Sequence, residues 1–145
     1  MHIYTMGFTQ KTAAQFFEKI MKNNIQIVID VRLNNQSQLA GFTKGEDLEY
    51  FLKVICNCLY VHETKFAPTK EILSSYKNGK IDWEKYVVEF DKLIVSRKMA
   101  DYFEKQYEKY NNVLLLCSES TPQNCHRRLL AESFSQGKDY EISHL

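Results

Sequence analysis

The sequence predicts an α/β fold: a single-domain, open, mostly parallel sheet with helices on both faces. Two apolar runs, residues 25–31 and 113–116, have the continuous hydrophobicity of strands that are covered on both sides. The segments around them carry apolar residues at helical spacing. Strands that alternate with amphipathic helices form such a sheet through right-handed crossovers. The 145 residues match the usual length of one domain, so we expect one domain over residues 1–145.

The remaining elements follow in order along the chain. Residues 2–8 predict a strand, and Thr9 is a suitable N-cap for a helix that ends at Asn23-Asn24. The polar residues 33–45 predict a surface loop after the strand at 25–31. The later elements that we expect are a helix around 48–55, a strand at 58–63, a short helix between Pro68 and Gly79, two helices within 82–110, the strand at 113–116, a helix over 125–137 and a last strand at 140–145.

Charge and hydropathy exclude several classes of protein. The 19 Lys and Arg residues nearly balance 18 Asp and Glu residues, so any anion site has to be local. No apolar run approaches the roughly 20 residues of a membrane span. The first residues lack the pattern of a signal peptide. We therefore expect a soluble, cytoplasmic protein that does not bind membranes.

The cysteines are Cys56, Cys58, Cys117 and Cys125. Cytosolic thiols stay reduced, so free thiols or metal ligands are expected rather than disulfides. Cys56 and Cys58 end an apolar helix without a basic neighbour, which favours a packing role for both.

Polar residues gather at two strand ends, which in a parallel sheet can face one crevice. One end carries Asp30 and Arg32, and the other carries Cys117 and Glu119. The Cys-His-Arg-Arg run at 125–128 follows at the start of a helix, where the helix dipole and free N–H groups favour an anion. Positive charge at such a place also lowers the pKa of a thiol.

These residues predict a small thiol-dependent transferase or hydrolase that acts on an anionic substrate, for example a phosphate-bearing or nucleotide-like one. The candidate residues are Cys117 or Cys125 as nucleophile, His126 as general base or thiolate partner, Glu119 or Asp30 as proton carrier, and Arg32 and Arg127, with Arg128 nearby, as anion-binding groups.

Other interpretations stay open. Asp30 and Arg32 lie on one face of a strand and could form a structural ion pair, and Cys117 could be a packing residue. In a nucleotide- or nucleic-acid-binding module, the arginines would contact phosphates and Phe42 would stack on a base. A metal-binding structural protein would use Cys117, Cys125 and His126, with His62, His144 or an acidic residue as the fourth ligand.

The chain resembles, over almost its whole length, the family catalogued as domain of unknown function 488. The matching residues are Ile3 to Phe8 with Gly7, Ile29-Asp30-Val31-Arg32, Ser37, Gly41-Phe42, Tyr60, Leu116-Cys117-Ser118-Glu119, Pro122, Cys125-His126-Arg127-Arg128 and His144. This resemblance implies membership of a family but no particular activity. The layout is also similar to that of rhodanese-like domains, which place a cysteine before a helix N-terminus, although the turn after Cys117 is longer here.

Overall fold

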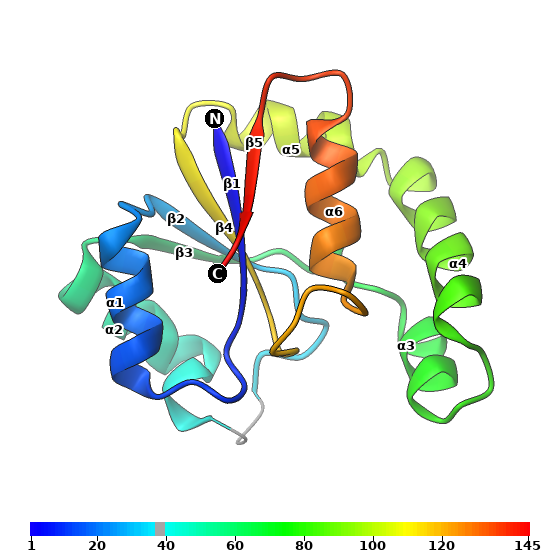
Figure 1. Cartoon of the computed structure of the whole chain (residues 1–145), viewed down its shortest axis with the longest axis horizontal. Coiled ribbons are helices and arrows are strands. Elements are labelled where there is room, and N and C mark those ends of the chain that lie inside the picture. Colours follow the sequence, from blue (N-terminus) through cyan, green and yellow to red (C-terminus); the bar gives the residue numbers. More distant parts are fainter. Residues whose placement is uncertain (37–39) are drawn as a thin grey trace.

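A computed structural model, which describes residues 1–36 and 40–145, confirms the expected α/β architecture. Its sheet has five parallel strands in the order β3-β2-β4-β1-β5 (Figure 1). The strands are β1 (His2–Gly7), β2 (Ile27–Asp30), β3 (Leu59–His62), β4 (Asn112–Cys117) and β5 (Glu141–His144). Ser37, one of the residues that carry the family resemblance, lies outside the described residues.

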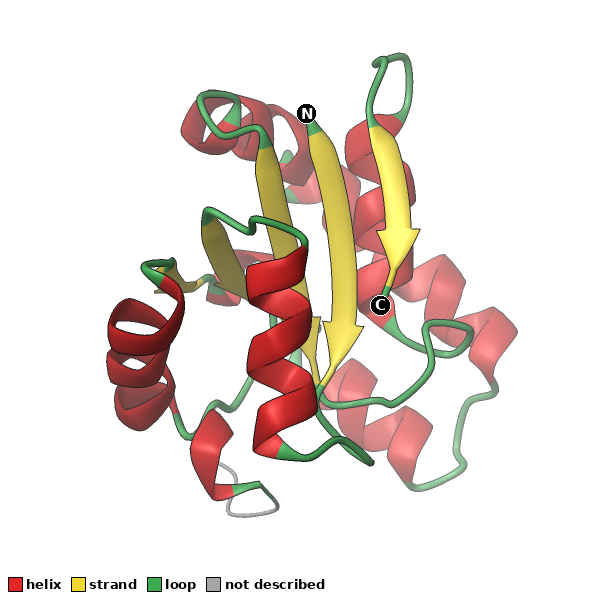
Figure 2. Cartoon of the chain, turned by 60° about the vertical axis from the view of Figure 1, so that its left-hand side comes forward, coloured by secondary structure: helices red, strands yellow, loops and turns green. Residues whose placement is uncertain are grey.

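Helices cover both faces of the sheet, as Figure 2 shows. They are α1 (Ala13–Lys22), α2 (Gly45–Cys56), α3 (Lys70–Lys77), α4 (Trp83–Ser96), α5 (Met99–Tyr107) and α6 (His126–Ser135). Helices α1 and α2 pack on one face, and α4, α5 and α6 contribute the buried side chains on the other. No helix in the described part of the chain is long and apolar enough to cross a membrane.

Alternating strand residues build two cores. Leu114 and Leu116 of β4 face α1 and α2, whereas Val113, Leu115 and Cys117 face the side of α6. Burial of each large aliphatic side chain contributes about 1.5–3 kcal/mol of transfer free energy. The same alternation therefore places the Cys117 thiol on the α6 side of the sheet.

The start of α1 corrects one prediction. Thr12, not Thr9, is the N-cap, and it exchanges hydrogen bonds with Gln15 in a capping box. The Thr9 hydroxyl instead donates to the Ser118 carbonyl at 2.8 Å. Thr9 therefore joins the turn after β1 to the turn after β4.

Strands β1 and β4 are neighbours in the sheet, but the helices that follow them pack on opposite faces. Helix α1 follows β1, and helix α6 follows β4. Such a switch point opens a crevice at the carboxyl ends of the strands. The end of β1 and the turn after β4 pass very close to each other there. A Cβ atom added at Gly7 would lie 1.5 Å from the Glu119 carbonyl oxygen. Only glycine at position 7 allows the turn after Cys117 to cross β1.

We therefore expect Gly7→Ala to lower the free energy of unfolding by about 3 kcal/mol, because the turn at Glu119 has to move away. Gly41→Ala is the control, since no atom of the described residues lies within 4 Å of a Cβ at Gly41. Urea denaturation of both variants checks this expectation. Equal stability of the two variants would contradict the close approach.

Candidate active site

A pocket of about 410 Å³ lies at the carboxyl ends of β2 and β4. The predicted site residues that line it are Arg32, Cys117, Glu119, Cys125 and His126. A shallower hollow of about 650 Å³ around Arg97 and Tyr102 contains none of the predicted site residues. The chemistry foreseen from the sequence is therefore concentrated in the smaller pocket.

The turn between β4 and α6 brings Cys117, Cys125 and His126 together. Their two sulfur atoms and a ring nitrogen all lie within 4.8 Å of one another. Cys117 Sγ lies 3.8 Å from His126 Nδ1. Cys125 is the N-cap of α6, and Cys117 is the last residue of β4. The two cysteines therefore lie close together although the turn separates them in the sequence. The sequence alone left this proximity open.

The backbone of β2 orients the His126 ring. Nε2 of His126 lies 2.8 Å from the Val31 carbonyl oxygen. A carbonyl only accepts hydrogen bonds, so Nε2 carries the hydrogen in this contact. In neutral histidine, the lone pair is then on Nδ1, the nitrogen that faces Cys117. His126 is thus arranged to take a proton from a thiol.

The two thiols of the pocket differ in acidity. A hydrogen bond from Cys125 lowers the pKa of Cys117, and the N–H groups of Ser118 and Glu119 and the charge of Arg127 act in the same direction against the effect of burial. The pKa of Cys125 is raised well above its ordinary value by its hydrogen bond to Cys117 and by burial. Cys117 is therefore the more readily ionised thiol, and Cys125 donates to it.

Cys56 and Cys58 stay outside the pocket, as predicted. Burial raises the pKa of both thiols, that of Cys58 to about 12. Their sulfur atoms lie near the backbone carbonyls of Phe17 and Leu59. They are ordinary packing thiols that serve as internal controls for Cys117.

Arg127 is fully buried and does not line the pocket. Its Nη1 donates to the Glu119 carbonyl at 2.6 Å. Within the described residues it has no carboxylate partner, and its Nε and Nη2 atoms have no hydrogen-bond partner. A buried guanidinium without a counter-ion is costly. After the hydrogen bond from Cys125 and the N–H of Ser118, the charge of Arg127 is a further cause that lowers the pKa of Cys117.

Asp30 and Arg32 form the ion pair that the sequence allowed. Arg32 Nε and Nη2 donate to the two Asp30 oxygens at 2.8 and 2.6 Å. The Asp30 carboxylate also accepts from the Tyr60 hydroxyl at 2.6 Å, and Arg32 Nη2 donates to the Thr43 carbonyl at 2.7 Å. Both carboxylate oxygens are thus engaged, and Asp30 does not reach the pocket.

Arg32 is one of the residues that line the pocket, although its side chain is only 3% exposed. Its guanidinium lies over the Phe8 ring, with Cζ 5.1 Å from the ring centroid, and Phe8 packs on the side of α1 and α2. The Nη1 atom is buried and has no partner among the described residues. The bidentate fork expected for a ligand is occupied by Asp30.

The other candidates lie toward the rim or elsewhere. Glu119 is exposed at the mouth of the pocket, and Arg128 contacts Glu132 and the Gln123 carbonyl outside it. Phe42 packs against the aromatic rings of α1 on the opposite face of the sheet. His62 forms a hydrogen bond with the Arg32 carbonyl, and His144 forms one with the Thr5 hydroxyl. Among the described residues, neither histidine belongs to the cluster of Cys117, Cys125 and His126.

Sequence reasoning missed the aromatic side of the pocket. Tyr76, Trp83 and Tyr86 line it from α3 and α4. Burial, together with the nearby Cys117 and Cys125, raises the pKa of Tyr86, so its hydroxyl keeps its proton. Trp83 and Tyr86 belong to the helical stripe predicted within residues 82–110. In such a stripe, an aromatic residue of the core and an aromatic residue of a pocket have the same spacing. Tyr76 belongs to the short helix predicted between Pro68 and Gly79.

A family model described as Domain of unknown function DUF488 matches residues 12–134. The match spans most of the 145 residues, and the chain belongs to this family. Searches of curated proteins and of solved structures gave no match.

Asp30→Asn should lower the free energy of unfolding by about 3–5 kcal/mol, because it leaves the buried Arg32 without its counter-ion. The double variant Asp30→Leu with Arg32→Met should lose less than the single variant, since no unpaired charge remains. Chemical denaturation of the three proteins compares these effects. A double variant that is less stable than Asp30→Asn would show that the pair itself stabilises the fold.

Alkylation by iodoacetamide should show a lower midpoint pH for Cys117 than for Cys56 or Cys58. The thiolate is the reactive species, so a lowered pKa moves the midpoint to lower pH. Arg127→Met removes the positive charge and should raise the Cys117 midpoint, with about tenfold slower alkylation at neutral pH for each unit of rise. Peptide mass spectrometry after timed labelling gives the rates.

Arg127→Lys keeps the charge and is the matched control for Arg127→Met. It should retain a Cys117 midpoint closer to that of the unmodified chain. If Cys125 reacted first, or if neither variant moved the Cys117 midpoint, the assignment of the thiolate would be wrong.

Proposed function

We propose that this member of the DUF488 family is a thiol-dependent transferase or hydrolase that acts on a small anionic substrate, with Cys117 as the nucleophile. One observation carries the proposal: His126 Nδ1 faces Cys117 Sγ at 3.8 Å while the Val31 carbonyl holds Nε2 at 2.8 Å. A nucleophile beside a base that a third group orients is the common arrangement of covalent catalysis.

The reaction would run in two steps. Cys117 Sγ attacks the electrophilic atom of the substrate and forms a covalent bond, while His126 Nδ1 takes the thiol proton. The bond to the leaving group breaks, and the leaving group receives that proton. Water, or a second acceptor in a transferase, then attacks the same atom and releases Cys117. Glu119 at the mouth of the pocket is suitably placed to exchange a proton with this second molecule.

An anionic substrate fits the charges around the thiol. Arg32 is one of the residues that line the pocket. The N–H groups of Ser118 and Glu119 point to Cys117 and could stabilise negative charge that develops there. Arg127 adds a buried positive charge behind the thiol. Because a free thiolate requires reducing conditions, the proposal includes a cytoplasmic location.

A metal centre is the second candidate, and the grouping of three ligand atoms within 4.8 Å favours it. Two cysteines and a histidine with an open fourth position are a known zinc arrangement. The Val31 carbonyl on Nε2 would also suit a metal-bound histidine. Against it, a metal needs both cysteines as thiolates, and the buried charge of Arg127 opposes a further cation.

A comparison of iodoacetate with iodoacetamide tests the proposed function. We expect the anionic reagent to be favoured at Cys117 by about tenfold relative to Cys56, because the positive charge of Arg127 acts on Cys117, whereas burial alone acts on the Cys56 thiol. Inorganic phosphate should protect Cys117 and leave Cys56 unaffected. The Cys117→Ser variant gives the background of the remaining thiols. Equal reagent ratios at Cys117 and Cys56, without protection by phosphate, would refute an anion-binding nucleophile.

Elemental analysis separates the two candidates. The thiol enzyme should contain far less than one zinc per chain, and a chelator should leave the Cys117 alkylation rate unchanged. One zinc per chain, together with alkylation that starts only after chelation, would instead establish the metal centre.

A further inference from the structure

Helices α3 and α4, which lie between β3 and β4 in the sequence, form the wall of the pocket opposite the strand ends. Helix α3 packs on α4, and none of its residues, all of which are described, is fully buried. In Figure 1, α3 lies at the same end of the molecule as the carboxyl ends of the strands. Its inward residues Leu73 and Tyr76 line the pocket. Helix α3 therefore contributes more to the pocket than to the core.

Aromatic rings run along this wall toward the histidine. Tyr76 lies 5.7 Å from Trp83 and 5.2 Å from Tyr86, measured between ring centroids. Trp83 and Tyr86 are stacked, with centroids 5.0 Å apart and planes 15° apart. Tyr76 is tilted against both, by 59° and 54° respectively, so the wall presents aromatic rings at an angle to one another.

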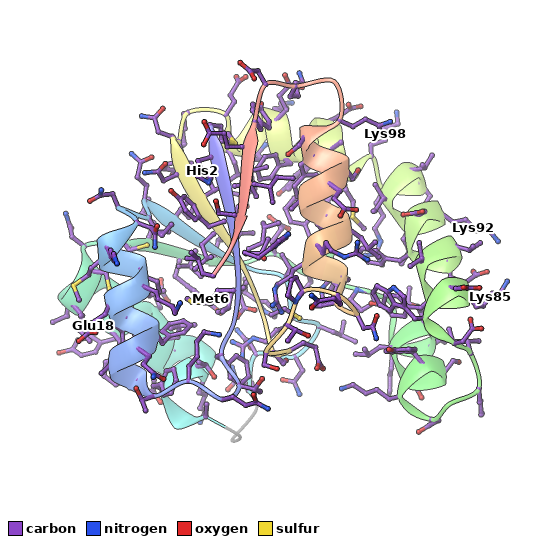
Figure 3. All side chains as sticks on the ribbon, viewed as in Figure 1. His2, Met6, Glu18, Lys85, Lys92 and Lys98 are labelled. Atoms are coloured by element: carbon purple, nitrogen blue, oxygen red, sulfur yellow. The ribbon has the colours of Figure 1, made fainter. Side chains whose placement is uncertain are left out.

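The outer side of α4 has a different character. Figure 3 shows Lys85 and Lys92 on the side of α4 away from α6, and both pair with Glu89 there. The aromatic residues of α4 are thus restricted to its inner side, where Tyr86 is buried and Trp83 is half-buried. The pocket consequently has an aromatic half and a polar half.

The polar half offers hydrogen-bonding groups at a fixed place. Thr9, Arg32, Asn34 and Ser118 line the pocket there. A volume of about 410 Å³ lies within the range of small-molecule sites and can hold more than an inorganic anion.

We propose that the ligand is an anion attached to a flat aromatic or heteroaromatic ring, which packs against Tyr76 and Trp83 while the anionic group lies in the polar half, beside Thr9, Arg32 and Ser118. This inference rests on the proposed function, because it assigns the substrate class of the same pocket. Stacking on an aromatic side chain accepts many rings, so a phenyl or a purine ring satisfies it. The anion is a phosphate or a carboxylate, both of which suit a guanidinium donor.

Trp83 makes the test direct, since it is the one tryptophan in the sequence. Phenyl phosphate and adenosine monophosphate are titrated into the full chain, with glycerol 3-phosphate as the control that lacks a ring. Tryptophan fluorescence reports contact with the wall, and calorimetry gives the dissociation constants. Both ring ligands should change the Trp83 emission saturably and bind about tenfold more tightly than glycerol 3-phosphate.

Two matched variants complete the experiment. Tyr76→Leu should weaken phenyl phosphate by about tenfold without weakening glycerol 3-phosphate, whereas Tyr50→Leu on the exposed side of α2 should change neither. Equal affinity for phenyl phosphate and glycerol 3-phosphate, no effect of Tyr76→Leu, or no binding of any of the three ligands would overturn the inference.

The two proposals fail in different ways. Cys117→Ser should still bind phenyl phosphate, because the sulfur takes no part in ring recognition. Ring-selective binding with an unreactive Cys117 would contradict the thiol mechanism but support the ligand class. A reactive Cys117 with no preference for a ring would support the thiol mechanism but contradict the ligand class.

Discussion

The buried charge of Arg127 is the constraint around which the site is organised. Its guanidinium is fully buried, has no carboxylate partner within the described residues and donates to the Glu119 carbonyl. That bond fixes the turn after β4, and Gly7 lets the turn cross β1. A hydrogen bond from Cys125 lowers the pKa of Cys117, and the charge of Arg127 acts in the same direction. The residue that holds the turn in place therefore also favours the thiolate form of Cys117.

A second polar network holds Arg32 in place at the end of β2. Asp30 at the end of β2 binds Arg32 and accepts from Tyr60 of β3, and Arg32 reaches the Thr43 carbonyl before α2. These bonds tie two strands and a turn together and hold Arg32 against the pocket. A carboxylate so fully engaged has no free oxygen to serve as a base. Its effect is to orient the arginine, while the Val31 carbonyl orients His126.

Much of the fold follows from residue patterns. The four apolar residues 113–116 predicted a central strand, and the break near 96–98 separated α4 from α5. The capping box of Thr12 and Gln15 was visible in the sequence and would have corrected the start of α1. The proximity of Cys117 and Cys125 was not visible, because it depends on how the turn between them folds over Gly7. The aromatic wall was hidden for a related reason, since inward-facing rings of α4 resemble core residues until the helix is placed.

Catalysis by Cys117 depends on a His126 ring that presents a bare Nδ1 to the sulfur. The most direct measurement is the ring nitrogen spectrum of His126 by long-range proton–nitrogen NMR, in the unmodified chain and in Cys117→Ser. We expect the hydrogen on Nε2 in the neutral ring, and an Nδ1 resonance that moves more than the Nε2 resonance when the sulfur is replaced. A neutral ring with its hydrogen on Nδ1, or an Nδ1 resonance indifferent to the sulfur, would contradict this expectation.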